Sequence, residues 1–347
     1  MTSLPGSAVM IIHGPELFDG GEAAWLMNII SPDRVIVAGV MARTAAEESG
    51  LPVEFIALPP SRVIGNLEGI AYLVTKGKTA KTGELFGNIV ASRIMKKGLV
   101  HIECTGKVVY CWDSGNKELA GSLSRLTCYK EISIQSIPEQ QDNYRKIQGC
   151  VSGEPVYVNG IIIGLATSET VVLTSTGGRI VPCSGLEPKP HGLEKLALCP
   201  PVNLSTAWCK SGKVRSASPV ISGKVPGGGR VLVIDHCGHE IYARMPDDCC
   251  GVLAIGDDTT SICGHILAHR GIPVLGIVDG DRDVIVPPAF ADGSVIAEVL
   301  GERDDDVGRE IAKKVPEIQV IWDEWVEEIL RYLAGRVHVV MDLRTNT

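Results

Sequence analysis

Three apolar segments of strand length, each followed within two residues by an acidic residue, constrain the fold of this chain more than any other feature. The segments are Val231–Ile234, Gly251–Ile255 and Ile272–Val278. Their nearly continuous Val, Leu and Ile content is typical of strands buried on both faces, as in a parallel sheet. Ligands of open α/β sheets lie at the carboxyl ends of such strands. The pattern therefore predicts a site at the acidic residues that follow, which are Asp235, Asp257, Asp258, Asp279, Asp281 and Asp283.

Alternating strand and helix patterns over most of the chain predict an α/β fold with two Rossmann-like parallel-sheet domains. Between them the period changes to short strands, and Asn159-Gly160 between two β-rich runs predicts a hairpin in a small antiparallel β insertion. A segment rich in Pro, Gly and Ser follows. The expected divisions are an N-terminal α/β domain at 1–140, a small β unit at 145–190, an irregular linker at 191–229 and an acidic α/β domain at 230–347.

Charge is unevenly distributed along the 347 residues. Residues 231–347 carry 22 Asp and Glu against 10 Lys and Arg, whereas the whole chain has a net charge of −8. An acidic C-terminal part argues against a broad nucleic-acid surface there, because phosphate backbones require clustered Lys and Arg. It is compatible with a bound cation.

The cellular setting is predicted from what the sequence lacks. The start, Met1 to Ser7, has no basic segment followed by a long apolar run, which argues against a secretory signal. No apolar run approaches the roughly 18 residues that span a bilayer. Eleven cysteines without a regular framework indicate reduced thiols. We therefore expect a cytoplasmic protein with no membrane association, and the sequence is compatible with a homo-oligomer.

The acidic residues favour a hard divalent cation. Mg²⁺ or Mn²⁺ is bound by one or two carboxylates, with water and substrate phosphate completing the shell. Carboxylates at the ends of neighbouring strands, which lie about 4.8 Å apart, can converge on one ion. The run Asp279-Gly-Asp-Arg-Asp283 presents alternate carboxylates in the manner of metal-binding turns. The alternative is that Asp and Gly are simply turn residues after strands.

Phosphate-binding candidates occur in both predicted α/β domains. In the C-terminal one, Thr259 and Thr260 open a helix directly after a strand, where free amides favour an anion. For Thr259 alone, an ordinary N-cap role is favoured over ligand binding. In the N-terminal one, His13 and Glu16 follow the first strand, and Lys78 and Thr79 follow a later strand.

The segment Gly77-Lys78-Thr79 resembles the end of a phosphate-binding P-loop. The first glycine of that motif would fall at Tyr72, inside a predicted strand. The loop therefore cannot wrap phosphate in the usual way, and only a looser phosphate contact is expected.

A softer metal is the alternative to Mg²⁺. Imidazole and thiolate groups suit zinc, iron or nickel, and histidines four residues apart share one helix face. No Cys-x-x-Cys pair supports this alternative. Its candidate ligands are His236, Cys237, His239, His265 and His269.

The chain also resembles an uncharacterised archaeal protein family seen especially in methanogens. The resemblance rests on Ile12–Asp19, Ala38–Ala45, Gly77–Gly87 and Gly256 through Asp281. It implies an archaeal cytosolic setting and no particular reaction. The C-terminal domain is more weakly similar to the acidic metal-binding fold of primases and topoisomerases, which expects a glutamate after its first strand, where this chain has Asp235-His236.

These observations support three hypotheses about function. The first is binding of a phosphorylated small molecule or nucleotide through a divalent cation held by Asp257, Asp279 and Asp281. If the protein is an enzyme, phosphoryl or nucleotidyl transfer, or hydrolysis, fits this arrangement. The second is a non-catalytic metabolite-binding or assembly factor, since no nucleophile–base pair stands out in the sequence. The third is a transition-metal-binding protein.

Overall fold

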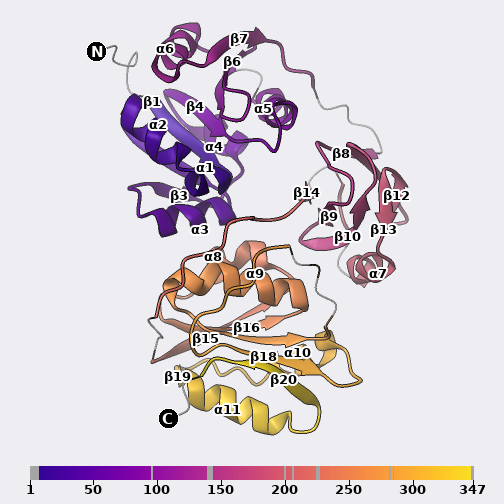
Figure 1. The fold of residues 1–347 in the computed structure, drawn as a ribbon. Helices are drawn as coiled ribbons and strands as arrows, with labels where there is room; N and C mark the ends of the chain where they lie inside the picture. Colours follow the sequence, from indigo (N-terminus) through magenta and orange to yellow (C-terminus); the bar gives the residue numbers. More distant parts are fainter. Residues whose placement is uncertain are drawn as a thin grey trace. The chain divides into compact units, whose positions relative to one another are not determined.

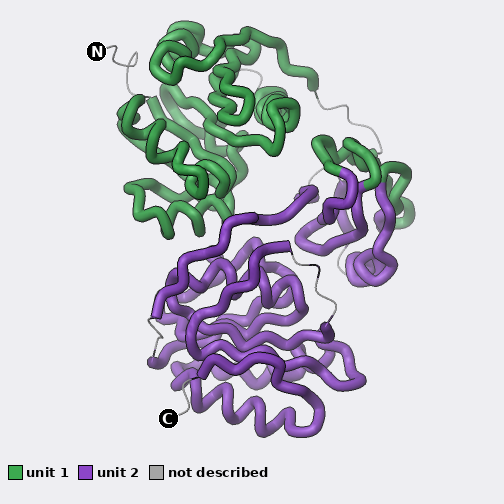
Figure 2. Tube along the Cα trace, viewed as in Figure 1, with its two compact units in different colours: residues 1–151, 167–177, 181–185 green, residues 152–166, 178–180, 186–347 purple. Residues whose placement is uncertain are grey.

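The computed structural model describes residues 8–94, 97–138, 144–198, 201–204, 207–223, 227–280, 283 and 285–344. The chain divides into two compact units (Figure 2), which are treated separately below. Unit 1 comprises residues 1–151, 167–177 and 181–185, and unit 2 comprises residues 152–166, 178–180 and 186–347. The mixed α/β class predicted from the sequence is confirmed in both units.

Unit 1 is built on a seven-stranded sheet with the order β3-β2-β1-β4-β5-β6-β7 (Figure 1). Every neighbouring pair is parallel except β5 and β6, which run antiparallel. The strands are β1 Ala8–His13, β2 Arg34–Ala38, β3 Glu54–Ile56, β4 Ile70–Thr75, β5 Leu99–Glu103, β6 Val108–Trp112 and β7 Lys130–Ile134. The helices are α1 Glu16–Asp19, α2 Glu22–Ile30, α3 Val40–Ser49, α4 Pro60–Asn66, α5 Ala80–Arg93 and α6 Lys117–Thr127.

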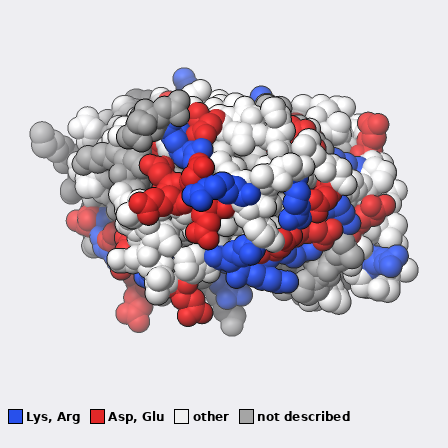
Figure 3. Space-filling view, turned by 90° about the horizontal axis from the view of Figure 1, so that it is seen from below, with Lys and Arg blue, Asp and Glu red and all other residues white. Residues whose placement is uncertain are grey.

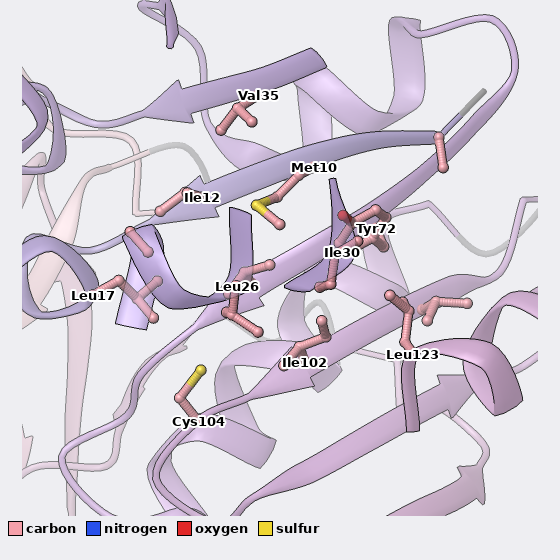
Figure 4. Packing of buried hydrophobic residues seen from close by; sticks show 14 of the residues in the cluster. Met10, Ile12, Leu17, Leu26, Ile30, Val35, Tyr72, Ile102, Cys104 and Leu123 are labelled. Carbon is pink, nitrogen blue, oxygen red and sulfur yellow. The ribbon is translucent and has the colours of Figure 1, made fainter. Parts of the chain in front are cut away.

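Apolar side chains on both faces of this sheet are buried, as the sequence pattern predicts for parallel strands. On one face, Met10 and Ile102 pack against Leu26 of α2 and Leu123 of α6 (Figure 4). A second cluster includes residues of α4 and α5. The two clusters hold the sheet between layers of helices.

Buried His101, in the central strand β5, makes the stability of unit 1 depend on pH. Burial lowers the pKa of His101 to about 3, so the folded protein keeps the ring neutral. The unfolded chain binds the proton below a pKa of about 6.5. The contribution of neutral His101 is therefore fully present above pH 6.5 and is lost as the pH falls toward 3.

Lowering the pH from 7 to 5 is expected to cost about 2 kcal/mol of unfolding free energy through this residue. Denaturant unfolding of the wild type and of His101→Asn at both pH values measures the difference. The variant cannot take up this proton and should lose about 2 kcal/mol less than the wild type. Equal losses in the two proteins would refute the assignment.

Short antiparallel strands follow the first sheet. The sheet β12-β11-β8 contains β8 Tyr144–Gln148, β11 Thr170–Thr176 and β12 Arg179–Ser184, and the sheet β13-β10-β9-β14 contains β9 Pro155–Val158, β10 Ile161–Ala166, β13 Leu186–Pro188 and β14 Cys209–Ser211. The hairpin predicted at Asn159-Gly160 is confirmed, since β9 and β10 are antiparallel and both turn residues have positive φ, 49° and 88°.

The segment predicted as an irregular linker contains regular structure. It holds α7 Pro190–Leu198 as well as β14. Proline at the first helical position is favourable, because the amide it removes has no partner there. Gly192 lets α7 lie against β10, since a Cβ at this position would come 1.8 Å from the carbonyl oxygen of Ile162.

The C-terminal part of unit 2 is a six-stranded sheet with the order β19-β15-β16-β17-β18-β20. Strands β15 to β18 are parallel, and the edge strands β19 and β20 are antiparallel to their neighbours. The strands are β15 Gly228–Asp235, β16 Cys249–Ile255, β17 Val274–Val278, β18 Val295–Val299, β19 Val320–Ile321 and β20 Val337–Asp342. The helical segments are η1 Gly238–Glu240, α8 Ile241–Arg244, α9 Asp257–Leu267, η2 Ala268–Arg270, α10 Asp304–Ala312 and α11 Trp322–Tyr332.

Helices cover both faces of this second sheet, with α9 on one side and α11 on the other (Figure 1). The core under α10 and α11 includes Leu253, Leu275, Val307 and Trp322. On the face shown in Figure 3, basic side chains lie in small groups next to acidic ones. None of the helices in the described residues is long and apolar enough to cross a membrane.

Candidate metal centre

The parallel strands of the C-terminal sheet bring their acidic ends to the same edge. In the pairing of β15 with β16, Asp235 lies opposite Ile255, and in the pairing of β16 with β17, Ile255 lies opposite Ile277. Asp257 and Asp279 follow these last two residues by two positions each. The sequence prediction that the acidic ends of these strands are neighbours therefore agrees with the register.

Among the described residues, His, Cys, Asp and Glu side chains come together in two groups of three that could hold an ion. The first group, called here the carboxylate group, is Asp257, Asp279 and Asp304, each with one oxygen within 4.8 Å of the other two. Asp304 is the first residue of α10 and is only 1 % exposed. Three carboxylates, from the first residue of α9, the residue after β17 and the first residue of α10, thus face one small volume.

Hydrogen bonds within the carboxylate group leave some oxygen atoms unused. Asp257 Oδ2 accepts the backbone N–H of Asp279 (3.0 Å) and of Gly280 (3.1 Å). Asp304 Oδ1 accepts the N–H of Asp305 (2.8 Å). Asp279 Oδ1 and Asp304 Oδ2 are buried and have no hydrogen-bond partner among the described residues. Burying a carboxylate oxygen without a partner is costly, and a cation would offset that cost.

The pKa values in this group also indicate that its negative charge is incompletely neutralised. Burial raises the pKa of Asp257 to about 6 despite its two backbone donors, and the neighbouring Asp279 carboxylate adds to the shift. Burial likewise raises the pKa of Asp304, with Lys195 partly opposing the shift. The local environment thus provides too little positive charge for these carboxylates, and a bound divalent cation would supply it.

The second group, called here the histidine group, is Asp235, His236 and Asp305. The Nδ1 atom of His236 lies 2.5 Å from Asp235 Oδ1, and this hydrogen bond lowers the pKa of Asp235. Its Nε2 atom lies 3.6 Å from Asp305 Oδ1. Both of these facing atoms are buried and lack a hydrogen-bond partner among the described residues. Sequence reasoning named Asp235 and His236 in separate proposals and did not name Asp304 or Asp305.

Two further predicted ligands stabilise the surrounding loops. Asp258 Oδ1 accepts the N–H of Asp283 (3.2 Å), and the Asp283 carboxylate forms an ion pair with Lys189 (2.7 Å). Neither belongs to a group that could hold an ion among the described residues. Asp281 lies outside the described residues.

A small cavity lies beside these acidic residues within unit 2. Its lining includes the acidic-edge residues Asp257, Asp258, Thr259 and His236 and the basic residues Lys189, His191 and Lys195. His191 and Lys195 belong to α7, in the segment that was predicted to be irregular, and Lys189 directly precedes this helix. Thr260, the other predicted threonine, is buried and packs against Gly276, where a Cβ would come 2.3 Å from its methyl carbon.

The predicted ligand residues of unit 1 have local structural roles. His13 Nδ1 donates to the Ala38 carbonyl (2.8 Å), and its ring stacks on Phe86. Thr79 forms a capping box with Thr82 at the start of α5. Glu16 and Lys78 are exposed. These residues belong to unit 1, whereas the carboxylate and histidine groups lie in unit 2.

The loop that resembles a P-loop is held by a buried carboxylate. Glu103 accepts N–H groups from Gly77 (2.9 Å), Thr105 (3.1 Å) and Gly106 (2.5 Å). The Gly77 amide therefore points at a protein side chain and is not directed toward a phosphate.

The other four residues of the softer-metal alternative do not join His236 in either group of the described residues. His265 is fully buried, with Nδ1 donating to the Pro287 carbonyl (3.0 Å). His239 stacks on Trp208. Burial raises the pKa of the Cys237 thiol, which disfavours a metal-binding thiolate, and His269 lies in the separate turn η2. This set stays a sequence-based prediction, and among its members only His236 belongs to a described group that could hold an ion.

Comparisons with known proteins identify relatives without a known activity. Residues 10–319 match a family described as uncharacterized protein conserved in archaea (DUF2117). The chain is 36 % identical over 332 residues to the uncharacterized protein MJ0065 of Methanocaldococcus jannaschii, covering 88 % of this chain and 90 % of that protein. No solved structure matches the chain significantly. The similarity to primases and topoisomerases stays an expectation from the sequence.

Proposed function

Because the chain belongs to this family of uncharacterised archaeal proteins, we propose a function from the site alone: binding of a phosphorylated small molecule or nucleotide through Mg²⁺ or Mn²⁺. The carboxylate group, Asp257, Asp279 and Asp304, would hold the ion. The observation that carries the proposal is the pair of buried oxygens, Asp279 Oδ1 and Asp304 Oδ2, that lack a partner among the described residues.

The chemistry of the carboxylate group favours a hard cation. Mg²⁺ takes oxygen ligands in octahedral geometry and keeps several waters, so three carboxylate oxygens leave room for water and a ligand phosphate. Asp304 replaces Asp281 in this proposal because it supplies the third oxygen in the described structure. Asp235, which the sequence also suggested for Mg²⁺, is directed at His236 instead.

The basic side chains of α7 support a phosphorylated ligand. Lys195 lies near enough to lower the pKa values of both Asp235 and Asp304, and it lines the cavity beside Asp257. Lys189 and Thr259 line the same cavity. An ammonium group and a divalent cation beside the same cavity would together neutralise a phosphate group.

Bound Mg²⁺ would polarise a phosphoryl oxygen, which suits phosphoryl or nucleotidyl transfer, or hydrolysis, if the protein is an enzyme. A non-catalytic binding factor would bind the same ligand without consuming it. Incubating the protein with Mg²⁺ and a nucleoside triphosphate, and measuring released phosphate or pyrophosphate, separates these two versions.

Replacing Lys195 by alanine tests the ligand half of the proposal. We expect Mg²⁺-dependent binding of ATP or pyrophosphate to weaken about 10-fold, because one charge-assisted contact to phosphate is lost. Binding of Mg²⁺ alone should be unchanged or slightly tighter. Isothermal titration calorimetry with each probe measures both quantities.

The matched control is Lys313→Ala, which removes an exposed lysine of unit 2 that does not line the cavity. It should bind both probes as the wild type does. If Lys195→Ala and Lys313→Ala bind ATP and pyrophosphate with the wild-type affinity, the phosphorylated-ligand proposal is wrong.

We also propose a cytoplasmic location without nucleic-acid or membrane partners. All the cysteines that the structure describes are free thiols, as expected in a reducing compartment. The acidic balance of residues 231–347 disfavours a phosphate-backbone surface in that part of the chain. Self-association into a homo-oligomer remains compatible with this location.

A further inference from the structure

We propose that the histidine group binds a second divalent cation, of the transition-metal class that includes Mn²⁺, Fe²⁺, Co²⁺ and Zn²⁺. The ion would lie between His236 Nε2 and Asp305 Oδ1. The centre would then hold two unlike ions side by side. The neighbouring Mg²⁺ rests on the proposed function, whereas the His236 site stands on its own geometry.

The two facing atoms have the separation of ligands that share an ion. Nε2 and Oδ1 lie 3.6 Å apart, which is too far for a hydrogen bond. Two ligand atoms at about 2.1 Å from one ion, with a near-tetrahedral angle between them, lie about 3.4 Å apart. The Asp305 side chain is only 5 % exposed, so Oδ1 is largely hidden from bulk water. An ion between these atoms would satisfy both of them.

Asp235 orients the histidine ring in the way that metal sites require. A histidine that binds a metal usually donates its other ring N–H to a carboxylate, which fixes the tautomer. Here the hydrogen bond between Nδ1 and Asp235 Oδ1 places the proton on Nδ1. The lone pair of Nε2 is therefore available toward Asp305. Asp235 acts as a positioning residue in this arrangement.

The backbone at His236 and at Gly256 has positive φ angles, and at Gly256 the missing side chain leaves space beside the imidazole ring. His236 has φ 55°, in the left-handed region that residues other than glycine seldom adopt. Such conformations are costly and cluster at functional sites. Gly256 has φ 99°, and a Cβ there would come 3.2 Å from His236 Nε2. The glycine thus leaves space next to the nitrogen.

The charge around Asp305 leaves one of its oxygens for an ion. Arg303 and Arg309 approach Oδ2, at 3.4 Å and 3.9 Å, whereas Oδ1 faces His236. The exposed Arg309 also approaches Asp235 Oδ2 (3.7 Å). The arginines therefore balance part of the negative charge without occupying the space between Nε2 and Oδ1.

The ligand atoms predict different ions at the two sites. Carboxylate-only sites suit Mg²⁺ and Mn²⁺, whereas an imidazole nitrogen favours transition metals. The sites are joined through consecutive residues of α10, because the N–H of Asp305 donates to Asp304 Oδ1. Because the two sites have different ligand atoms, a substitution that removes a ligating side chain from one site should abolish binding of that site's ion and leave binding of the other ion in place.

Cobalt binding by the metal-stripped full chain, purified without a histidine tag, tests this inference. Co²⁺ with a nitrogen ligand is followed by visible absorption, and Mg²⁺ by calorimetry. We expect His236→Asn to weaken Co²⁺ binding at this site at least about 100-fold, since an imidazole ligand is lost, and to leave the Mg²⁺ affinity within a few-fold of the wild type. Asparagine tolerates the left-handed backbone better than most residues do.

His239→Asn is the matched control, since this histidine stacks on Trp208 and does not belong to the group. It should keep the cobalt spectrum.

Asp305→Asn should lose the spectrum as His236→Asn does. Agreement between the two variants shows that the loss is not a folding defect of one of them. Asp279→Asn should lose Mg²⁺ and keep the spectrum. No cobalt spectrum in the wild type, or an unchanged one in folded His236→Asn, would overturn the inference, whereas loss of Mg²⁺ binding alone would not affect it.

Discussion

Asp304→Asn is expected to weaken Mg²⁺ binding at least about 100-fold, because it removes one of three carboxylates from the carboxylate group. Asparagine has nearly the same shape and can still accept the N–H of Asp305 through Oδ1. It cannot supply the negative charge that a hard cation requires. The ion-free variant should be at least as stable as the wild type, since a buried charge without a partner is gone. Calorimetric titration with Mg²⁺ and thermal unfolding measure the two effects.

The control for this variant is Asp306→Asn, two residues further along the same helix. Asp306 carries the same charge near the same helix N-terminus, but its side chain is 69 % exposed and lies near Arg309. General loss of negative charge would affect both variants, whereas loss of a ligand would affect Asp304→Asn alone. Mg²⁺ affinities that are equal in the two variants would contradict the carboxylate site.

Trp322→Ala is expected to lower the unfolding free energy of unit 2 by about 3–5 kcal/mol, the range for truncating a buried aromatic side chain. Trp322 is 1 % exposed and packs against Trp325. Gly251 of β16 lies so close that a Cβ there would come 2.1 Å from the indole ring. Its Nε1–H donates to the Gly293 carbonyl (2.8 Å), so the substitution also removes the partner of that carbonyl.

Denaturant unfolding followed by circular dichroism measures this loss. The control is Trp208→Ala in the same unit, because Trp208 is 43 % exposed and should cost about 1 kcal/mol or less. A loss below about 1 kcal/mol for Trp322→Ala would show that α11 does not pack on the sheet as described.

The sequence predicted the sheet edge at which these acidic residues meet because period and polarity are local properties. The apolar runs of β15, β16 and β17 identify parallel strands, and parallel strands bring their acidic ends to one edge. Asp257 and Asp279 follow from that reasoning alone. Asp304 does not, because its place depends on where α10 packs, some 25 residues after Asp279. An acidic triplet at a helix start is also explained by the helix dipole, so its sequence signal is ambiguous.

The residues of α7 were missed for a different reason. Pro190 and Gly192 interrupt the local helical pattern, and such residues usually indicate an irregular segment. In the structure the proline begins the helix and the glycine allows close contact with β10. Both functions depend on the tertiary partner, which the sequence does not display. Lys195 of this helix consequently had no predicted place beside the acidic residues.

In unit 1 the predicted ligand residues have local structural partners, and their ligand roles stay predictions. His13 ends β1, and Thr79 lies in the turn between β4 and α5, at the edge where a doubly wound sheet holds ligands. Their side chains instead bond to Ala38 and to the start of α5. Side-chain bonds to nearby backbone compete with ligand binding, and composition alone does not separate the two uses.

Anomalous diffraction from crystals of the full chain soaked in Mn²⁺ tests the cation site most directly. We expect a manganese peak within about 2.5 Å of carboxylate oxygens from Asp257, Asp279 and Asp304 together. Manganese absent from these three carboxylates, with their buried oxygens instead hydrogen-bonded to water or protein, would contradict it.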